Sequence, residues 1–501
     1  MWRYWLRLGL GCVVLALGWG ATVAAHPAAQ AGGIYYVAVN GSDVSGNGSA
    51  AAPWATITYA LDRVPDGSTV LVRPGDYVGR VRLRGNFTHG VLVRAEVPYQ
   101  ARLRNTTDKV ITTYDGARGI TLSGFDIAHG GAGAVALVVH IDGGGVQGRV
   151  THITLTDNIF HDSYNNDILK INNGATHITV RGNMFYNQSG SDEHIDVNSV
   201  EDVVIEDNVF FNDFAGSGRV NGNNTSAFVV VKDSNGTDDW VLGSKRVTLR
   251  RNVFLNWEGS SGYGFIQIGE DGTASYEADG VLIENNLLLG NASHPMRAPL
   301  GVMGSRNVTF RNNTVVGNLP SNAFAMRLYT YGSNQPNVNI AFYNNIWADP
   351  TGTLTDFSDT PAGQTTSWTL HNNLYWNGGA VLPVGGDDLV NYTNDAARIL
   401  GNPQLGGQAG LLLPRWNPGS ETFAGGATSI RAVFEGLVYA YGIPAGVAVF
   451  DVADALYAPS DDILGRLRAS GGLPDLGAYE RLVLHERLYL PLVLRGLTTV
   501  P

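Results

Sequence analysis

The stretch that decides the fold repeats one phrase three times: Asn158-Ile-Phe160, Asn183-Met-Phe185 and Asn208-Val-Phe210. Each copy is an asparagine, an apolar residue and a phenylalanine, and each begins 25 residues after the one before it. A fixed period of this length is typical of stacked repeats, in which each repeat forms one coil of a solenoid. The same stretch, continued to Lys232, also holds the residues from which we predict a functional site.

Short β-branched segments recur in front of these asparagines and in front of later ones. The repeat asparagines are Asn158, Asn183, Asn208, Asn252, Asn286, Asn313, Asn345 and Asn373. Each copy thus predicts a short strand, a turn that contains asparagine, and a second short strand. Asparagine suits such turns because it tolerates the left-handed backbone region, and stacked asparagines can hydrogen-bond one another. No helical pattern of useful length interrupts the region, so we predict an all-β, right-handed parallel β-helix, a single-stranded solenoid.

The remaining sequence divides the chain into five segments. We interpret them as a signal peptide (1–31), an N-terminal cap (32–68), the parallel β-helix (69–400), irregular closing coils (401–480) and a C-terminal tail (481–501). The cap contains a strand at 35–39 and an amphipathic helix at 56–64, which can cover the open end of a solenoid. The tail is too short to span a bilayer, and it is either a last strand or a sorting segment.

Composition limits the compartment and the partners. Arg3 and Arg7 precede an apolar run and a small-residue cleavage site, which is typical of a secretory signal, although an uncleaved anchor is the alternative. We therefore expect a secreted, extracellular or cell-surface protein, monomeric and without a membrane span in its mature chain. Cys12, the sole cysteine of the 501 residues, lies within the signal, so the mature chain has neither disulfides nor a thiol nucleophile. The net charge of −11 argues against nucleic acid as a partner.

Acidic residues gather on two consecutive repeats. Asp192, Glu193 and Asp196 lie within five residues of sequence, and Asp167 has the same phase as Asp192 one repeat earlier. Unpaired carboxylates this close repel one another unless a proton or a cation intervenes. Ca²⁺ accepts several oxygen ligands in irregular geometry, so we predict that these four residues bind calcium. The alternatives are a solvated acidic corner or a cation that only links two coils.

Lys232 is the candidate general base. It ends the apolar run Phe228-Val-Val-Val-Lys232 after a glycine- and asparagine-rich insertion. Solenoid insertions often gather on the binding face. Lys170 is the rival base, and its alternative role is to pair with Asp196. A lysine whose tip merely reaches solvent at the strand end is the structural alternative for Lys232.

The chain resembles known proteins in two respects. Its N-terminal segment, its asparagine-aromatic coils and its closing Asp475-Leu-Gly-Ala-Tyr-Glu480 are similar to secreted right-handed β-helix proteins of the pectate-lyase-like superfamily, over about residues 34–480. The acidic group and the lysine resemble family 9 polysaccharide lyases, in which one coil gives an Asp, the next an Asp-Asp-x-x-Asp group, and a later lysine is the base. That resemblance implies calcium at Asp167, Asp192, Glu193 and Asp196, with Lys232 as base; Glu193 departs from the family's Asp, and His194 and Ile195 replace its glycine and aromatic.

This resemblance implies cleavage of an acidic, uronate-containing (pectate-like) polysaccharide by β-elimination. A cation on the uronate carboxylate stabilises the charge that develops as the C5 proton leaves, and it favours an uncharged lysine. Arg219, Arg297 and Arg327 are candidates for holding a second carboxylate. The alternatives are a uronate C5-epimerase, a glycoside hydrolase that uses Asp192 with Asp196, and a non-catalytic carbohydrate-binding or surface solenoid, for which Trp240, Trp257 and Tyr263 are candidate contacts.

Overall fold

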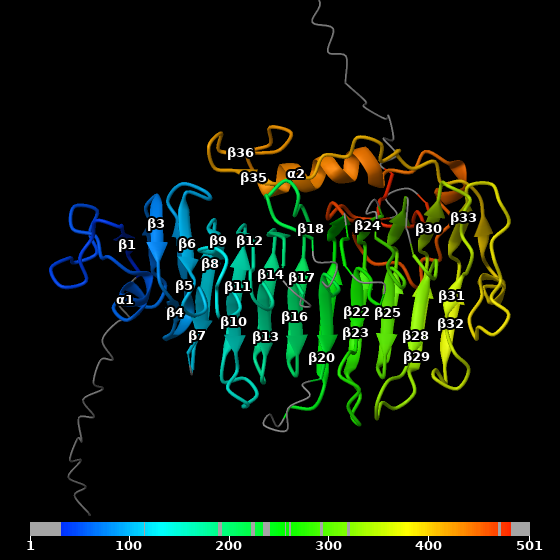
Figure 1. Ribbon diagram of the computed structural model, residues 1–501, viewed down its shortest axis with the longest axis horizontal. Coiled ribbons are helices and arrows are strands. Elements are labelled where there is room, and N and C mark those ends of the chain that lie inside the picture. The colour runs from blue at the N-terminus through cyan, green and yellow to red at the C-terminus, as the bar shows by residue number, and fades with distance from the viewer. Residues whose placement is uncertain are drawn as a thin grey trace, which may run out of the picture.

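The computed structural model describes residues 32–114, 116–188, 193–221, 226–233, 241–255, 257–259, 262–290, 294–317, 321–468 and 472–481. The signal predicted at 1–31, with Cys12, lies outside these ranges, as do Asp192, Trp240 and residues 482–501 of the predicted tail. Within them the chain forms the predicted right-handed parallel β-helix, which Figure 1 shows from the side. No helix in this part of the chain is long and apolar enough to cross a membrane.

Each complete coil, from residues 69–83 (β2–β4) to residues 338–359 (β29–β31), gives one strand to each of three parallel sheets in the described ranges. The first sheet contains β1 (Ile34–Val37), β2 (Thr69–Val72), β5 (Asn86–Ala95), β8 (Arg118–Ser123), β11 (Thr151–Thr156), β14 (Thr176–Arg181), β17 (Glu201–Glu206), β20 (Ser244–Arg250), β23 (Ala278–Glu284), β26 (Arg306–Arg311), β29 (Val338–Tyr343) and β32 (Trp368–His371). The second contains β3 (Gly75–Val78), β6 (Ala101–Asn105), β9 (Asp126–His129), β12 (Ile159–His161), β15 (Met184–Tyr186), β18 (Val209–Phe211), β21 (Val253–Leu255), β24 (Leu287–Leu289), β27 (Thr314–Val316), β30 (Ile346–Asp349), β33 (Leu374–Asn377) and β34 (Ile399–Leu400). The third contains β4 (Val81–Leu83), β7 (Ile111–Thr113), β10 (Val139–Asp142), β13 (Leu169–Asn172), β16 (Ile195–Asn198), β19 (Val229–Lys232), β22 (Ile266–Ile268), β25 (Leu300–Met303), β28 (Met326–Tyr329) and β31 (Ser358–Asp359).

The repeat asparagines form a buried ladder between the first and second sheets. The side-chain amide of Asn183 donates to Oδ1 of Asn208 at 3.1 Å and to the carbonyl of Leu155 at 2.9 Å. The backbone N–H of Asn183 donates to the same Oδ1 at 2.9 Å. This pattern continues from Asn158 to Asn373, whose amide donates to Asp395. Each rung therefore satisfies polar groups on neighbouring coils and holds those coils in register.

The explanation from left-handed turns was wrong for these asparagines. The left-handed backbone lies one residue earlier, at Asp157, Gly182, Asp207, Arg251, Asn285, Asn312, Asn344 and Asn372, with φ between 49° and 66°. The chain bends from the first sheet into the second at that preceding residue. The asparagine that follows points into the corner and reaches the next coil. The asparagines are thus selected for hydrogen bonding and not for their backbone freedom.

Phenylalanines stack in the core beside the ladder. Phe160, Phe185, Phe210 and Phe254 are fully buried, and their successive ring centroids lie 4.9, 5.1 and 4.8 Å apart. Such offset stacking adds to the free energy gained from apolar burial. The asparagine and the phenylalanine of each repeat phrase thus stabilise the same corner of the solenoid, one by hydrogen bonds and one by packing.

Replacing one rung should destabilise the whole solenoid. Asn208→Ala removes the acceptor for Asn183 and the donor to Val180, and each buried group left unsatisfied costs about 1–3 kcal/mol. We expect a loss of several kcal/mol in the free energy of unfolding, measured by urea denaturation. Asn86→Ala, at an exposed position of β5, is the matched control and should change the free energy of unfolding little. Equal small effects of both variants would contradict the ladder's role.

The N-terminal cap is confirmed, with a shorter helix than predicted. Helix α1 spans Ile57–Leu61, and the Thr56 hydroxyl accepts from the backbone N–H of Tyr59 at its start. Ile57, Ala60 and Leu61 are buried at the end of the core. The apolar face that the sequence assigned to this helix therefore covers the first coils.

The C-terminal residues run back along the solenoid instead of only closing its end. Helix α2 (Ile430–Leu437) was not predicted; it lies across the second sheet with η2 (Val438–Gly442), as Figure 1 shows above β18 and β24. Its buried side chains join the outward apolar residues of the second sheet in a second core. Three short elements accompany it: the antiparallel pair β35 (Trp416–Asn417) and β36 (Thr422–Phe423), and η3 (Val447–Val449).

Residues beyond η3 are anchored by the left-handed asparagines. The side-chain amides of Asn285, Asn344 and Asn372 donate to the backbone carbonyls of Asp461, Asp454 and Val452 at 2.9, 3.0 and 2.8 Å. The turn residues therefore bind the returning segment, while the ladder residues next to them bind neighbouring coils. The second sheet is covered on its outer face as a result.

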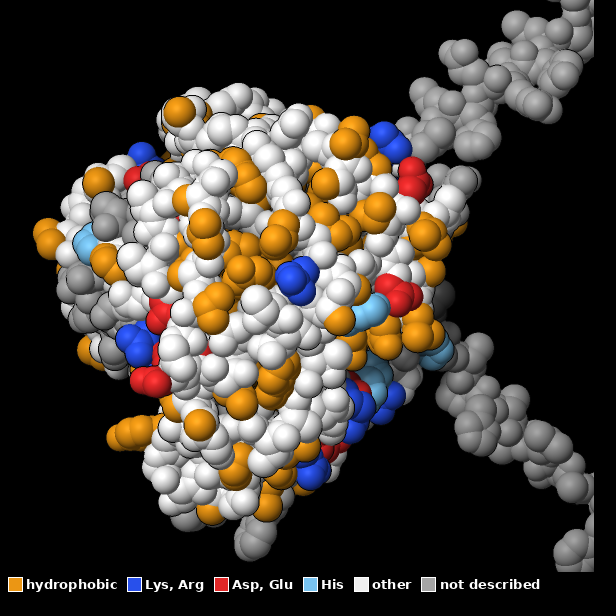
Figure 2. All heavy atoms as spheres, turned by 90° about the vertical axis from the view of Figure 1, so that its right-hand side faces the viewer, with side chains coloured by type: hydrophobic (Ala, Val, Ile, Leu, Met, Phe, Trp, Pro, Cys, Tyr) orange, Lys and Arg blue, Asp and Glu red, His pale blue; other side chains and the backbone are white. Residues whose placement is uncertain are grey.

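The coil after β33 closes the far end of the solenoid. Asp395 accepts from the last rung of the ladder, Leu382 and Val390 are buried, and η1 (Tyr392–Asn394) packs nearby. Figure 2, which faces this end, shows hydrophobic side chains scattered among uncharged surface with few charged groups.

A half-buried histidine, His161, joins two coils on the second sheet. His161 Nε2 lies 2.7 Å from Oδ1 of Asp126, and its Nδ1 lies 2.7 Å from Oδ2 of Asp162. Both ring nitrogens face carboxylates, so the ring is held as the imidazolium. Burial lowers the pKa of His161, but the charges and hydrogen bonds of the two aspartates raise it above 6.5 overall. The pKa values of Asp126 and Asp162 are lowered correspondingly.

This arrangement predicts a pH dependence of stability. A raised folded-state pKa contributes stability that is complete below the unfolded pKa of 6.5 and is lost as pH rises through the folded value. The aspartates contribute stability that is lost as pH falls through their lowered pKa values. We expect the thermal midpoint to fall as pH rises above about 6.5 and the slope to flatten in His161→Gln. An unchanged slope in that variant would exclude His161 as its source.

Candidate functional site

Three of the four predicted acidic ligands converge on the third sheet. Asp167 lies two residues before β13, Glu193 lies two residues before β16, and Asp196 lies on β16. Each residue offers an oxygen, and these oxygens lie within 4.8 Å of one another. All three residues are at least 96% buried. Asp192 lies outside the described residues, so its part in the cluster stays a prediction.

The register between the two coils differs by one residue from the sequence-based phase. Leu169 pairs with Ile195, and the backbone N–H of Ile168 donates to the carbonyl of Glu193 at 3.1 Å. Asp167 is therefore opposite Glu193 and not opposite Asp192, and its Oδ1 accepts from the Glu193 N–H at 3.1 Å. The ladder corner keeps the 25-residue period, whereas the corner between the second and third sheets contains one residue more.

Lys170 pairs with two carboxylates of the acidic cluster, those of Asp196 and Asp167. It lies opposite Asp196 on the neighbouring strand, and its Nζ is 2.5 Å from Oδ2 of Asp196 and 3.7 Å from Oδ2 of Asp167. The pairing with Asp196 that the sequence offered as the alternative to a base is the one found. Burial lowers the pKa of Lys170, and the charges of Asp196 and then Asp167 raise it overall. The lysine is therefore an ammonium counter-ion at neutral pH.

Lys232 lies on the same outer face, two strand positions from Asp196. It is in register with Asn198 of β16, and alternation along the strand turns both side chains away from the core. Its Nζ is 2.6 Å from Oε2 of Glu270 and 3.4 Å from Oδ1 of Asp271. The predicted base and the predicted cation ligands thus share one face of the solenoid.

Glu270 and Asp271 were missed by the sequence analysis. They follow β22 after Gly269, one coil after Lys232, so the signal that could have found them is their phase relative to the lysine. Burial lowers the pKa of Lys232, but the charges of Asp196, Glu270 and other carboxylates raise it well above its ordinary value overall. With these carboxylates ionised, Lys232 carries a proton at neutral pH.

Glu193 is held in its uncharged form, whereas the two lysines are held in their charged form. Burial and then the negative charges of Glu270 and Asp167 raise the pKa of this carboxyl well above 4.5. It therefore retains a proton at a pH where an exposed glutamate is ionised. A cation that used Glu193 as a ligand would have to displace this proton.

Asn198 provides a further oxygen beside the cluster. Its side-chain Nδ2 faces both carboxylate oxygens of Asp196 at 3.4 and 3.3 Å. Its Oδ1 is buried and has no hydrogen-bond partner in the described part of the chain. A buried polar atom without a partner indicates an unfilled ligand position, for a cation or for a donor group of a substrate. Hard cations prefer carboxylate and amide oxygens, so the donor set fits Ca²⁺.

The other predicted side chains fall in different places. Arg219 donates to Asp162 and to the carbonyl of Ser163, which fastens the insertion to the corner beneath it. Trp257 is buried in the core and is not available to a carbohydrate. Arg297 and Arg327 both form ion pairs with Asp359, on the same face as the acidic cluster.

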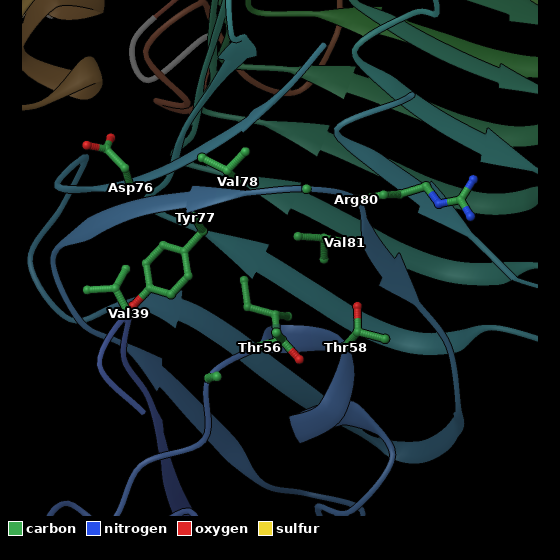
Figure 3. A pocket seen from close by; sticks show the side chains of 11 residues that line it. Val39, Thr56, Thr58, Asp76, Tyr77, Val78, Arg80 and Val81 are labelled. Atoms are coloured by element: carbon green, nitrogen blue, oxygen red, sulfur yellow. The ribbon is translucent and has the colours of Figure 1, made fainter. Parts of the chain in front are cut away.

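A hollow at the N-terminal end of the solenoid is separate from this cluster. It has a volume of about 240 Å³ and lies between α1 and the first coils, where Thr56, Tyr77 and Val81 line it. Figure 3 shows the charged side chains of Asp76 and Arg80 extending away from its centre. Those two residues pair with Arg102 and Asp108 respectively. The hollow therefore offers no convergent reactive groups.

Comparisons with known proteins found similar solved structures, all at low sequence identity. No protein-family model and no curated protein matches the sequence. Pectate lyase Pel9A is 16% identical, covers 91% of this chain and 98% of its own, and has a TM-score of 0.47. An alginate lyase from Paenibacillus sp. str. FPU-7 (13% identity, 67% and 96% covered, TM-score 0.40) and a GH136 lacto-N-biosidase from Eubacterium ramulus (12%, 69% and 68%, 0.42) are also similar. At these values the activity has to be argued from the site itself.

The position of Lys170 predicts that removing its charge will tighten cation binding. A charge pair about 4 Å apart is worth about 1–4 kcal/mol, so Lys170→Met should raise the affinity for Ca²⁺ about tenfold or more in isothermal titration calorimetry. Lys109→Met is the matched control, because Lys109 contacts His140 and not the acidic cluster. Weaker binding in Lys170→Met would show that the ammonium supports the cation site instead of competing with it.

Proposed function

We propose that this protein is a calcium-dependent polysaccharide lyase that cleaves an acidic, uronate-containing polysaccharide by β-elimination. The observation that carries the proposal is the arrangement on the third sheet. Asp167, Glu193 and Asp196 converge from two coils, and Lys232 faces outward on the same sheet. A cation site and a proton acceptor side by side are the two groups that elimination from a uronate requires.

Asp167, Glu193, Asp196 and, from the sequence, Asp192 would hold the cation. Asn198 Oδ1 adds a neutral oxygen beside them. When bound there, Ca²⁺ would neutralise the substrate carboxylate and stabilise negative charge next to C5. The residues themselves supply a fixed, buried set of oxygens that needs little rearrangement, because neighbouring strands hold them in place.

Lys232 would accept the C5 proton. Its Nζ must first lose its own proton, which Glu270 at 2.6 Å and the other carboxylates oppose. Positive charge bound at the acidic cluster offsets the contribution of Asp196 and favours the neutral amine. Nζ then takes the C5 proton, the C4–O4 bond breaks, and a C4–C5 double bond forms. Water can supply the proton that the departing O4 needs.

Glu270 is positioned to regulate this lysine. In the arrangement described, it holds the ammonium of Lys232 away from an incoming proton donor. A substrate hydroxyl that donates to Glu270 in place of Lys232 would free Nζ for the reaction. Tyr263 also contacts Glu270, and burial with the nearby charge of Glu270 raises the pKa of its phenol. Tyr263 therefore remains a neutral hydrogen-bond donor beside the base.

Glycoside hydrolysis is the second candidate, and Glu193 favours it. A protonated carboxylic acid beside ionised carboxylates is the pattern of a general acid with a nucleophile. Two observations stand against it: Asp196 is occupied by the Lys170 ammonium, and Glu193 is buried. Elimination gives a product with ultraviolet absorbance, whereas hydrolysis gives new reducing ends without it. Proton exchange at C5 without cleavage would indicate an epimerase.

Two substitutions separate the proposed roles. Lys232→Ala should lower turnover by about 10²–10⁴-fold while leaving Ca²⁺ affinity largely unchanged, because it removes only the proton acceptor. Asp196→Asn should weaken Ca²⁺ binding and turnover together. Turnover is followed by product absorbance on a panel of uronate polymers with Ca²⁺ or EDTA, and binding by calorimetry. Full activity of Lys232→Ala, or activity in EDTA equal to that in Ca²⁺, would overturn the mechanism.

A further inference from the structure

Two arginines share one carboxylate on the outer face of the third sheet. Arg327 lies on β28, and Asp359 is its register partner on β31. Arg297 Nε donates to Oδ2 of Asp359 at 2.6 Å, and Arg327 Nε lies 2.9 Å from the same oxygen. Two guanidinium groups against one carboxylate leave a net positive charge on a protein whose overall charge is −11. We call these three residues the arginine pair with its aspartate.

The two arginines differ in how firmly they are held. The guanidinium of Arg327 lies 3.6 Å from the centre of the Tyr329 ring, and its Nη1 donates to the carbonyl of Gly262 at 3.2 Å. Arg297 contributes only its Nε to Asp359, and in the described residues neither of its Nη groups contacts an acceptor. Its side chain is 39% exposed. One arginine is therefore a fixed platform, and the other presents free donors to solvent.

The strand register connects this pair to the acidic cluster. The outward position of Asp196 continues through Val230, Gln267 and Gly301 to Arg327. Four strand spacings of about 4.8 Å put Arg327 about 19 Å from Asp196. The three residues between them are uncharged and nearly or fully buried. The acidic cluster and the arginine pair thus lie along one line that crosses the strands.

Gly301 leaves room for the side chain of Gln267 on this line. A Cβ at this position would lie 2.1 Å from the Gln267 side-chain oxygen, so the site excludes any larger residue unless Gln267 moves. Gln267 itself lies flat, because its amide donates to the carbonyl of Gly269 at 2.7 Å. The register line between the two clusters therefore carries no charged side chain.

We propose that Arg297 and Arg327 form a second carboxylate-binding subsite, which holds a uronate of the same chain about 19 Å from the one that reacts. Guanidinium groups bind carboxylates through paired, charge-assisted hydrogen bonds, and Arg297 has both Nη groups available for this. The subsite selects chains that carry free carboxylates at regular intervals and that are long enough to reach from one cluster to the other. This inference rests on the proposed function and adds the substrate's length and charge pattern to it.

Arg297→Gln tests the subsite with little risk to the fold, because Arg327 still pairs with Asp359. The probes are size-graded oligogalacturonates, from dimers to chains that span both clusters, and methyl-esterified chains of equal length. For long free-acid chains, we expect the variant to raise KM about tenfold, since charge-assisted hydrogen bonds are lost. For dimers and for esterified chains, KM should not change. Arg306→Gln is the matched control, because Arg306 pairs with Asp279 on the first sheet, away from this face.

The outcomes separate this inference from the proposed function. An unchanged KM for long chains in Arg297→Gln, with turnover intact, overturns the subsite and leaves the lyase standing. The same loss for short and long chains also overturns it, because the effect would then not depend on reach. If the wild-type protein shows no turnover, calorimetric binding of long and short free-acid chains to wild type and Arg297→Gln still tests the subsite. A length-dependent loss of affinity in the variant would support it without any lyase activity.

Discussion

Hydrogen bonding between successive coils is the constraint on which the rest of this structure depends. A parallel sheet built without crossover helices has no local hairpin to fix its register, so register has to be set at the corners. The asparagine ladder does this, since each rung bonds the backbone and the side chain of the adjacent coil. Because the ladder is buried, a slip by one residue would leave several polar groups without partners.

This fixed register holds a cluster of buried carboxylates together on the third sheet. Asp167, Glu193 and Asp196 are nearly fully buried, and three such carboxylates would repel strongly if all were ionised. Two mechanisms relieve this repulsion in the described arrangement: Lys170 inserts its ammonium, and Glu193 retains a proton. A bound divalent cation would take the place of the Lys170 ammonium and of the Glu193 proton. Cation binding, proton release and displacement of Lys170 would therefore be coupled.

The returning C-terminal segment decides which face of the solenoid is open. Helix α2 and the residues after it cover the second sheet, where the asparagines of the left-handed turns bind them. The first sheet's outer face carries ion pairs between adjacent coils, such as Arg250 with Glu206. Of these faces, the third sheet carries the buried acidic cluster and the arginine pair, with uncharged residues on the register line between them.

The sequence by itself determined the solenoid and the convergence of Asp167, Glu193 and Asp196, because both follow from a period that can be counted. It also indicated the cap, from the apolar face of a short helix. It also predicted Lys232 at the end of a strand, and alternation with the core residues Val229 and Val231 turns its side chain outward. Only the tertiary structure decided that Asp167 faces Glu193, because the corner between the second and third sheets holds one extra residue. The partners of Lys232, Glu270 and Asp271, and the path of residues 401–481 also required it. These depend on contacts between coils, and on distances in sequence that no single repeat encodes.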